Sequence, residues 1–504
     1  MKNKLSAALL CDFYKISHRN MYPKGTEMVY STWTPRASRM KGVDHVVNFG
    51  GQAFIKNYLI DFFEEAFFSR PKEEVVAEYK RLLTHALGVP NPDASHIEEL
   101  HDLGFLPISI KSLPEGTLVP LRVPMLTIQN TDPKFFWLTN YIETLASCEL
   151  WQAMTSATIA GEYRKILDKY AFKTVGDNGF VMFQGHDFSM RGMSSLQSAI
   201  TSGMGHLLSF AGTDTIPAIQ GAESVYNANI EKQLVGTSIP ATEHSIQCAF
   251  EDDVEYLTHM MTKVHPTGPV SIVSDGYDFW QVIREVIPSL KETILARDGG
   301  PESLDKVVIR PDSGDPVLIV CGDPNGKTEL ERKGAVEALW DIFGGSVTEK
   351  GYKLLDSHIG LIYGDAITLR RCEEICERLE AKGFASINAV FGIGSYTYQY
   401  NTRDTFGFAL KSTLCVINGK EKQIFKDPKT DNGIKKSQKG KVVVYRDLQT
   451  GKITFADNLG LNDSIYMRKD GKNIDCDMLK EIYRDGKLLI DDDFESIRAR
   501  LAKG

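Results

Sequence analysis

The run GPVSIVSDGYDFWQVIREVI, residues 268–287, joins a short apolar segment to a helical pattern through a polar loop. Its apolar segment VSIVS has the length of a buried strand, the loop DGYD carries two carboxylates, and the apolar residues that follow recur at helical spacing. A strand, a loop and a helix in this order predict a parallel strand with a crossover helix. We therefore expect a parallel sheet, either doubly wound or closed into a barrel.

A similar order recurs in DKVVIRPDSGDP (305–316), HIGLIYGDAITLRRCEEICERLEAKGF (358–384) and SINAVFGIGS (386–395). In the second of these segments, Thr368 is expected to cap the helix and Gly383 to end it. Residues that suit a ligand follow each strand: Asp275 and Asp278, Arg310 and Asp312, Gly364 and Asp365, Gly392 and Gly394. Because parallel strands point the same way, these loops should meet at one mouth of the sheet. Any single loop could instead make only a turn or a helix cap.

The chain before residue 180 has a different pattern. Residues 54–87 show helical spacing broken at Pro71, and residues 106–132 contain short strand-like runs separated by turn residues. Residues 133–171 return to an aromatic-rich helical pattern. This order predicts an α+β layer, and the final run DDDFESIRARLAKG (491–504) predicts a capped terminal helix.

Composition limits the function classes. The 504 residues are 42% hydrophobic and 25% charged with a net charge of −8, which argues against a general nucleic-acid or anionic-membrane surface. No apolar stretch approaches the roughly 20 residues that a membrane span needs. Eight cysteines scattered along the chain indicate a reducing, cytoplasmic setting. For Cys372 and Cys376, helix-face packing is favoured over metal binding, since no second pair completes a site.

His244 stands in SIPATEHS (238–245), a run of small and nearly neutral residues. No second histidine lies within a helical turn, and the chain has no HExxH pattern. On these residues alone, a structural histidine bonded to backbone is the simpler interpretation.

Two other stretches suit a sugar phosphate and a flat ring. In HDFSMRGMSS (186–195), Phe188 could stack on a ring and Arg191 could hold a phosphate, and its two C-terminal serines could cap the next helix. In RPDSGDP, Asp312 could accept ribose hydroxyls while Arg310 meets a phosphate or a polar ring substituent. The lysine-rich segment 420–441 is either a solvated loop or a polyphosphate site.

Together these motifs resemble the nicotinamide phosphoribosyltransferase family along nearly the whole chain. The matching runs, in order, are LLCDFYKISHRNMYPKGTEMVYS (9–31), LPISIKSLPEG (106–116), NTDPKFFWLTNYIET (130–144), HDFSMRGMSS, GTDT (212–215), SIPATEHS, VSIVSDGYD (270–278), IRPDSGDP (309–316), YGD (363–365), FGIGS (391–395), R-D (403–404) and FKDP (425–428). Departures from the family pattern include Ser395 in place of a glycine and Ala409 in place of a serine near the phosphates.

The resemblance implies an α/β fold with two parts: an irregular (β/α) barrel-like domain over 151–409, and an α+β sheet domain built from 1–150 and 410–504. It also implies transfer of a phosphoribosyl group from phosphoribosyl pyrophosphate to nicotinamide, with Mg²⁺ and with ATP as co-substrate. The protein would be a homodimer with its sites at the subunit interface.

The resemblance also implies roles for individual residues. Phe188 and Tyr14 of the partner subunit would sandwich the pyridine ring, and Arg310 would contact nicotinamide. Asp214 would accept the carboxamide N–H, and its charge would repel nicotinate. The catalytic set would be His244, phosphorylated by ATP, with Asp275 and Asp312. The ribose and phosphates would meet Arg191, Arg36, Gly364, Asp365, Gly394, Ser395, Arg403, Lys411, Lys426 and Lys435.

Two alternatives stay open at this point. A nicotinate phosphoribosyltransferase would share the architecture, and Asp214 speaks against it. A catalytically silent dimer that binds ligands is the second alternative, and the joint presence of His244, Arg310 and Asp312 speaks against it.

Overall fold

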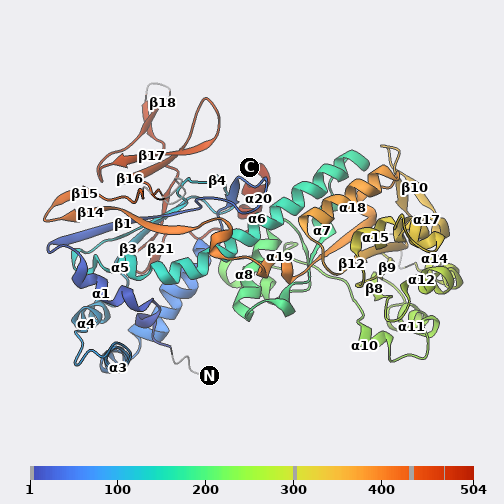
Figure 1. Cartoon of the computed structure of the whole chain (residues 1–504), viewed down its shortest axis with the longest axis horizontal. Coiled ribbons are helices and arrows are strands. Elements are labelled where there is room, and N and C mark those ends of the chain that lie inside the picture. The colour runs from blue at the N-terminus through green and yellow to red at the C-terminus, as the bar shows by residue number, and fades with distance from the viewer. Residues whose placement is uncertain (1–4, 299–303, 429, 431–435, 470–471) are drawn as a thin grey trace. The chain divides into compact units, whose positions relative to one another are not determined.

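Two sheets of different kinds organise the chain, one in each of two units (Figure 1). Unit 1 comprises residues 1–158, 222–228 and 401–504, and unit 2 comprises 159–221 and 229–400. The computed structural model describes residues 5–298, 304–428, 430, 436–469 and 472–504. A curled parallel sheet and a separate antiparallel sheet confirm the expected α/β fold class.

The sheet of unit 2 is parallel throughout, with strand order β7-β6-β13-β12-β9-β8. Its strands are β6 (Gly185–Asp187), β7 (Gly212–Thr213), β8 (Val270–Val273), β9 (Val307–Arg310), β12 (Ile359–Tyr363) and β13 (Ala389–Ile393). Nearly all of their residues are buried, as expected where helices cover a parallel sheet. The register pairs Ile359 with Val307 and Leu361 with Ala389.

A short segment bridges both edges of this sheet. Thr237 pairs with Gly212 beside β7, and Ala241 pairs with Ser271 on β8, both in parallel orientation. Backbone bonds support the pairing, because Thr213 N donates to Thr237 O (2.9 Å) and Thr242 N donates to Ser271 O (3.0 Å). Residues 237–242 therefore close the curled sheet into an irregular barrel, and His244 follows this closure directly.

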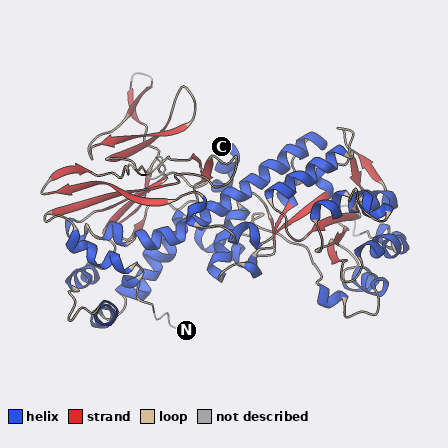
Figure 2. Ribbon diagram, viewed as in Figure 1, coloured by secondary structure: helices blue, strands red, loops and turns tan. Residues whose placement is uncertain are grey.

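Helices cross between the strands of unit 2 as the sequence pattern predicts (Figure 2). They include α7 (Val181–Gln184), α8 (Leu196–Leu207), α10 (His244–Gln247), α11 (Asp253–His259), α12 (Phe279–Gln281), α13 (Ile287–Ser289), α14 (Lys291–Leu295), α15 (Pro316–Cys321), α16 (Glu329–Lys333), α17 (Ala335–Phe343), α18 (Leu369–Ala381) and α19 (Ser395–Gln399), with the hairpin β10 (Gly345–Val347) and β11 (Lys353–Leu355). Helices α6 (Glu143–Thr174) and α9 (Ile216–Tyr226) contribute residues to both units.

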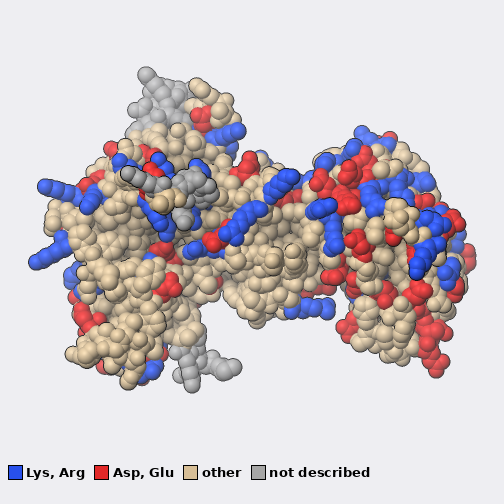
Figure 3. Space-filling view, in the orientation of Figure 1, with Lys and Arg blue, Asp and Glu red and all other residues tan. Residues whose placement is uncertain are grey.

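Helix α18 confirms the local signals predicted for it. The Thr368 hydroxyl accepts from Arg371 N at 3.3 Å, and Gly383 takes φ +77° after the last turn. Cys372 and Cys376 are fully buried on the inner face of this helix, as expected for packing. Over this end of unit 2, Lys and Arg side chains alternate with Asp and Glu, so the visible surface carries both signs of charge (Figure 3).

Unit 1 is built around an antiparallel sheet with strand order β15-β14-β1-β5-β3-β20-β21. The strands are β1 (Thr26–Thr34), β3 (Ile108–Ser112), β5 (Leu126–Asn130), β14 (Ala409–Ile417), β15 (Lys420–Gln423), β20 (Lys480–Arg484) and β21 (Lys487–Leu488). Trp33 on β1 faces Leu410 on β14 and Leu126 on β5. The sheet thus interleaves strands from the two ends of the chain, as the resemblance implied.

Helices and two-stranded sheets complete unit 1. The helices are α1 (Phe13–Met21), α2 (Gly51–Phe54) continued by η2 (Ile55–Phe62) and η3 (Glu64–Phe68), α3 (Lys72–Leu87), α4 (Ser95–Leu103), α5 (Leu138–Tyr141) and α20 (Phe494–Lys503). The small sheets pair β2 (His45–Val47) with β4 (Leu118–Pro120), β16 (Lys441–Arg446) with β17 (Ile453–Leu459), and β18 (Tyr466–Lys469) with β19 (Lys472–Asp475). The helical run is interrupted at Pro71, as predicted.

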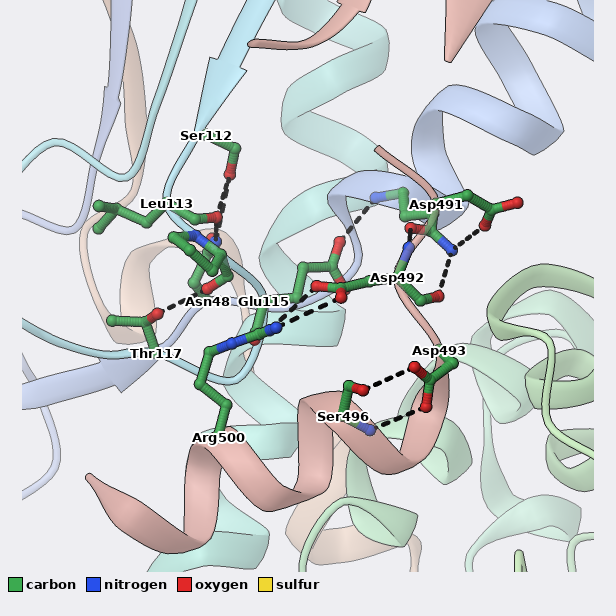
Figure 4. Close-up of polar contacts among 12 residues, drawn as sticks. Asn48, Ser112, Leu113, Glu115, Thr117, Asp491, Asp492, Asp493, Ser496 and Arg500 are labelled. Atoms are coloured by element: carbon green, nitrogen blue, oxygen red, sulfur yellow. Dashed lines mark hydrogen bonds and ion pairs between the residues drawn. The ribbon is translucent and has the colours of Figure 1, made fainter. Parts of the chain in front are cut away.

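A buried polar network fastens the C-terminal segment within unit 1 (Figure 4). Glu115 is buried and accepts from Gln52 N at 2.7 Å and from Gly50 N at 3.2 Å. Arg500 on α20 donates to Glu115 O and to Asp492 Oδ2, the latter at 3.0 Å. Burial raises the pKa of Glu115. Such satisfied networks specify one arrangement of the chain, here the packing of the last helix.

Among the described residues, no helix combines the length and the apolar content that crossing a membrane would require.

Candidate functional site

Most of the sequence-predicted site residues of unit 2 lie at the carboxyl end of its parallel strands. Phe188 follows β6, Asp214 follows β7, Asp275 follows β8 and Asp312 follows β9. Gly364 and Asp365 follow β12, and Gly394 and Ser395 follow β13. Because the strands are parallel, these residues share one edge of the sheet, where ligands bind in α/β folds.

His244 is oriented by a buried carboxylate. Its Nε2 lies 2.9 Å from Asp275 Oδ1, with the Asp275 side chain 2% exposed and the His244 side chain 49% exposed. The other oxygen of Asp275 accepts from Asp312 N (2.9 Å), Ser313 N (2.7 Å) and Ser313 Oγ (2.6 Å). Burial alone would raise the pKa of Asp275, but these bonds and His244 lower it overall. An ionised carboxylate only accepts, so His244 Nε2 carries the hydrogen and a neutral ring leaves its lone pair on Nδ1.

Arg310 and Asp312 form an ion pair beside this group. Arg310 Nε lies 3.5 Å from Asp312 Oδ2, and an Arg310 guanidinium N–H donates to Thr242 O at 2.6 Å. The pKa of Asp312 is raised, first by burial and then by Asp275, against the lowering effect of Arg310. Within the described residues, Asp312 Oδ1 is buried without a hydrogen-bond partner. This oxygen can accept from a ligand hydroxyl or meet a cation.

Asp214 is held as a carboxylate by two polar neighbours. Its Oδ1 lies 2.9 Å from His186 Nε2 and accepts from Ser238 Oγ at 2.6 Å. Burial by itself would raise the pKa of Asp214, but His186, Ser238 and the charge of Arg310 together lower it. Nearly half of the side chain is exposed, so Asp214 can offer a negative charge to a ligand.

Glycines let Phe188 lie close to the strands. A Cβ atom added to Gly392 would lie 2.7 Å from Phe188 Cε2 and 2.9 Å from Gly364 Cα, closer than real contacts allow. The Phe188 ring also contacts the His186 ring, with centroids 4.9 Å apart. A Cβ atom on Gly364 would likewise collide with the Asp312 carboxylate. Both glycines therefore preserve the geometry of the site.

The remaining predicted residues of unit 2 surround this edge more loosely. Arg191 is exposed in the turn Met190–Gly192, and Asp365 is exposed after β12. Ser195 caps α8 by accepting from Ser198 N at 3.1 Å. Gly394 precedes α19 and has open space where a side chain would stand.

The other predicted basic residues lie in unit 1, where two of them share a cavity. Arg36 and Lys411 line a cavity of about 170 Å³ with Thr34, Arg122, Ala409, Lys436, Ser437, Gln438, Phe455 and Asp457. We call it the cationic cavity. Burial, with Arg36 and two other nearby cations, lowers the pKa of Lys411, although Glu143 opposes the shift. Lys426 lies next to the cationic cavity, because Lys426 N donates to Oγ of the lining residue Ser437 at 2.9 Å. Lys435 lies outside the described residues.

Tyr14 and Arg403 share a different cavity of unit 1. It has a volume of about 240 Å³ and is also lined by Asp12, Glu143, Thr144, Ser147, Cys148 and Trp151. The Tyr14 side chain is 56% exposed on α1. Glu143 pairs with buried Lys15 and lies 3.6 Å from Lys411 Nζ.

Several contacting residues were not singled out from the sequence. They are His186 and Ser238 at Asp214, Thr242 at Arg310, and Glu143 at Lys411. Each contact joins residues 24 or more positions apart, so no local pattern marks it. The quoted motifs HDFSMRGMSS and SIPATEHS contain His186, Ser238 and Thr242, and NTDPKFFWLTNYIET contains Glu143. Their place in these motifs is the one signal that could have found them.

Comparisons with known proteins show the family of the chain. Residues 183–482 match the family model of the nicotinate phosphoribosyltransferase (NAPRTase) family, and residues 6–110 match the nicotinamide phosphoribosyltransferase N-terminal domain. Two solved structures share the fold. Human nicotinic acid phosphoribosyltransferase has a TM-score of 0.60 at 14% sequence identity, and the match covers 98% of this chain and 93% of that chain. A nicotinate-nucleotide pyrophosphorylase from Pyrococcus furiosus has a TM-score of 0.56 at 16% sequence identity, and the match covers 99% of this chain and 94% of that chain. Fold and family model thus define a phosphoribosyltransferase class.

Relatives found by sequence comparison show which family of phosphoribosyltransferases the chain resembles. The chain is 49% identical over 500 residues to a nicotinamide phosphoribosyltransferase of Acinetobacter baylyi, covering 98% of this chain and 96% of the relative. It is 34% identical over 494 residues to one of Xanthomonas campestris, covering 97% and 96%. The chain belongs to the nicotinamide phosphoribosyltransferase family.

Proposed function

We propose that this protein transfers the phosphoribosyl group of phosphoribosyl pyrophosphate to nicotinamide, giving nicotinamide mononucleotide and pyrophosphate in NAD salvage. The observation that carries the proposal is the ionised Asp214 at the same sheet edge as Phe188 and the Arg310–Asp312 pair. An aromatic face, a carboxylate and a sugar-binding pair are the groups that this reaction needs side by side.

The substrate ring would stack on Phe188 while its carboxamide N–H donates to Asp214. The lowered pKa of Asp214 keeps the carboxylate charged at neutral pH, so nicotinate would bring a second negative charge against it. Like charges in contact cost several kcal/mol. Selectivity for the amide follows from this repulsion.

The chemical step forms a bond from the pyridine nitrogen to the anomeric carbon while the bond from that carbon to pyrophosphate breaks. The nitrogen lone pair is free, so no general base has to remove a proton. Asp312, with its unpartnered buried oxygen, suits a ribose hydroxyl, and cationic side chains suit the departing pyrophosphate. Holding the ring in line with the sugar supplies much of the remaining rate.

Mg²⁺ would bind together with the pyrophosphate group of the substrate. In the described part of the chain, no three His, Cys, Asp or Glu side chains form a metal-binding group. Mg²⁺ needs only one or two carboxylates when substrate phosphates and waters complete its shell, and the Asp312 carboxylate would serve. There it would neutralise charge on the leaving group.

We also propose that ATP stimulates the reaction by phosphorylating His244. The Nδ1 lone pair would bond to the γ-phosphorus as the bond from that phosphorus to ADP breaks, and the Nε2–H group would keep donating its hydrogen bond to Asp275. The support is the 2.9 Å His244–Asp275 contact and the half-exposed imidazole.

The proposed working form is a homodimer in which Tyr14 of the partner subunit covers the substrate ring. Phe13 and Tyr14 are both more than half exposed on α1, which leaves two aromatic side chains for such a contact. Some of the basic side chains that meet the phosphates would then come from the partner subunit.

A competition assay tests the proposed function. The purified protein would receive equal amounts of nicotinamide and nicotinate with phosphoribosyl pyrophosphate and Mg²⁺, and both mononucleotides would be measured by mass spectrometry. We expect nicotinamide mononucleotide in large excess. A preference for nicotinate would contradict the proposal.

A further inference from the structure

The cationic cavity of unit 1 contains an arginine to which none of the phosphate assignments above gives a role. Arg122 lines it together with Arg36, Lys411 and Lys436, and Asp457 is the single carboxylate of the lining. Glu143 and Asp427 also lie near Lys411 and Lys436, so four cations face three carboxylates in a small space, and positive charge remains in excess. Such a cavity favours an anion.

The backbone at Arg122 is held in a conformation that favours glycine. Its φ is +71°, in the left-handed region that a residue with a side chain adopts only at a cost. Two bonds hold it there: Arg122 N donates to Pro35 O at 2.6 Å, and Gln438 Nε2 donates to Arg122 O at 3.2 Å. Gln438 is fixed in turn by Thr32, whose hydroxyl donates to it at 3.1 Å. Strain that the surroundings hold in place is characteristic of functional positions.

The Arg122 guanidinium differs from the lysines of the cavity in its contacts. Across the part of the chain that the structure describes, no hydrogen bond or ion pair engages it. The two lysines of the cavity differ, since Lys436 Nζ lies 3.3 Å from Asp427 and Lys411 Nζ lies 3.6 Å from Glu143. Arg122 therefore offers its planar fork of donors to a ligand.

We infer that Arg122 binds a phosphate or pyrophosphate group of the substrate or product in the cationic cavity, beside Arg36 and Lys411; this inference rests on the proposed function. The cavity of about 170 Å³ holds several times the roughly 30 Å³ of one water, yet it is smaller than the roughly 300 Å³ or more of a drug-sized pocket. A phosphoryl group suits that size. Ala409, which stands where the family has a serine, lines the same cavity but has no side-chain hydrogen-bond donor. The guanidinium of Arg122 supplies hydrogen-bond donors there.

Titration calorimetry on the full-length protein tests the inference, with inorganic pyrophosphate and ribose 5-phosphate as separate probes. Arg122→Gly removes the cation and places glycine where φ is positive, so the variant should be at least as stable to heat as the parent. We expect its affinity for one of the two anions to fall about tenfold to hundredfold, the effect of losing a charge-assisted hydrogen bond. The anion for which the affinity of Arg122→Gly falls identifies the group that occupies the cavity.

Two further variants sharpen the result. Arg122→Lys keeps the charge without the fork and should retain part of the affinity. Lys487→Gln removes an exposed cation from β21, at the far edge of the same sheet, and should bind both anions as the parent does.

Parental affinity of Arg122→Gly for both anions, or no measurable binding of either anion to the parent, would overturn the inference. A product assay on the same samples separates it from the proposed function. A parent that binds an anion through Arg122 but forms no nicotinamide mononucleotide would leave the site standing and refute the function. If the parent forms nicotinamide mononucleotide while all variants bind both anions equally well, the function stands and the role of Arg122 is refuted.

Discussion

Asp214 is the residue on which the proposed choice of substrate depends. Its contacts with His186 and Ser238 keep it ionised, and its partial exposure makes the charge available to a ligand. The neighbouring carboxylate Asp278 lies after a different strand of the same sheet but is committed to capping α12, where it accepts from Trp280 N at 2.9 Å. The two carboxylates therefore make a matched pair for mutation.

Asp214→Asn should reduce the preference for nicotinamide over nicotinate by at least about tenfold, because the like-charge contact, which costs several kcal/mol, is gone. The ratio of kcat/KM for the two substrates measures this. Asp278→Asn also removes one charge but keeps the helix cap, and it should leave the ratio unchanged. An unchanged ratio in Asp214→Asn would remove Asp214 from its proposed role.

At this scale the sequence indicated the charged residues but not their partners. Asp214, Asp275 and Asp312 follow recognisable strand ends, so their position at the sheet edge could be predicted. The bonds from His186 and Ser238 to Asp214 depend on how separate strands align, and the sequence contains no local signal for that alignment.

At the scale of elements, the glycine of β13 allows the close packing of Phe188. Gly392→Ala would force the ring and the neighbouring backbone apart, since the new Cβ would lie 2.7 Å from Phe188 Cε2. We expect KM for nicotinamide to rise about tenfold or more with a smaller change in KM for phosphoribosyl pyrophosphate, because misplacing a binding group weakens the contact it makes.

Gly360→Ala is the matched control on β12. There the new Cβ would meet Lys306 Cδ at 3.0 Å, near the flexible end of a side chain that can move. Steady-state kinetics with circular dichroism on both variants make the comparison. A folded Gly392→Ala with a parental KM for nicotinamide would show that the ring position does not matter.

The strand and helix units of unit 2 could be predicted because the change from a strand to a helical period is local to each segment. The closure of the sheet by residues 237–242 could not, because that segment has neither the alternation nor the length of a strand and contains Pro240. Its strand-like pairing exists only because both edges of the curled sheet approach it.

At the scale of the whole molecule, stability should depend on pH through buried histidines. His96 in unit 1 packs edge-on against Trp137, with ring centroids 4.9 Å apart, and its Nε2 lies 3.4 Å from the Tyr79 hydroxyl. Burial, aided by the charge of Arg19 and opposed by Asp93, lowers the pKa of His96 to about 4. His206 in unit 2 is fully buried, and its pKa is also lowered to about 4.

The sign of the pH effect follows from these values. Between pH 6.5 and 4 the unfolded chain protonates each histidine while the folded chain does not. Each such group removes up to about 1.4 kcal/mol of unfolding free energy per pH unit as the pH falls through this window. His96→Phe keeps the ring packing and removes one titrating group, so its urea midpoint should fall less than that of the parent between pH 6.5 and 4. Equal falls would contradict the assignment of a buried neutral His96.

The pairing of chain ends in unit 1 marks the limit of prediction without a family resemblance. Strands β1 and β14 are hydrogen-bonded neighbours although Thr34 and Ala409 lie 375 positions apart. The individual strands show alternating or apolar patterns, but no residue pattern specifies which distant strand each one joins. The resemblance implied a domain made from both ends, and the polar network of Glu115 and Arg500 shows one physical means by which the C-terminal segment is fastened.

In the proposed reaction, the cluster at the sheet edge of unit 2 makes nicotinamide mononucleotide, and His244 couples this reaction to ATP. The most direct measurement is product analysis with nicotinamide, phosphoribosyl pyrophosphate and Mg²⁺, with and without ATP, for the parent and for His244→Ala. We expect nicotinamide mononucleotide and pyrophosphate from both proteins, with ATP stimulation in the parent alone. Absence of the mononucleotide from the parent reaction, or full ATP stimulation in His244→Ala, would contradict it.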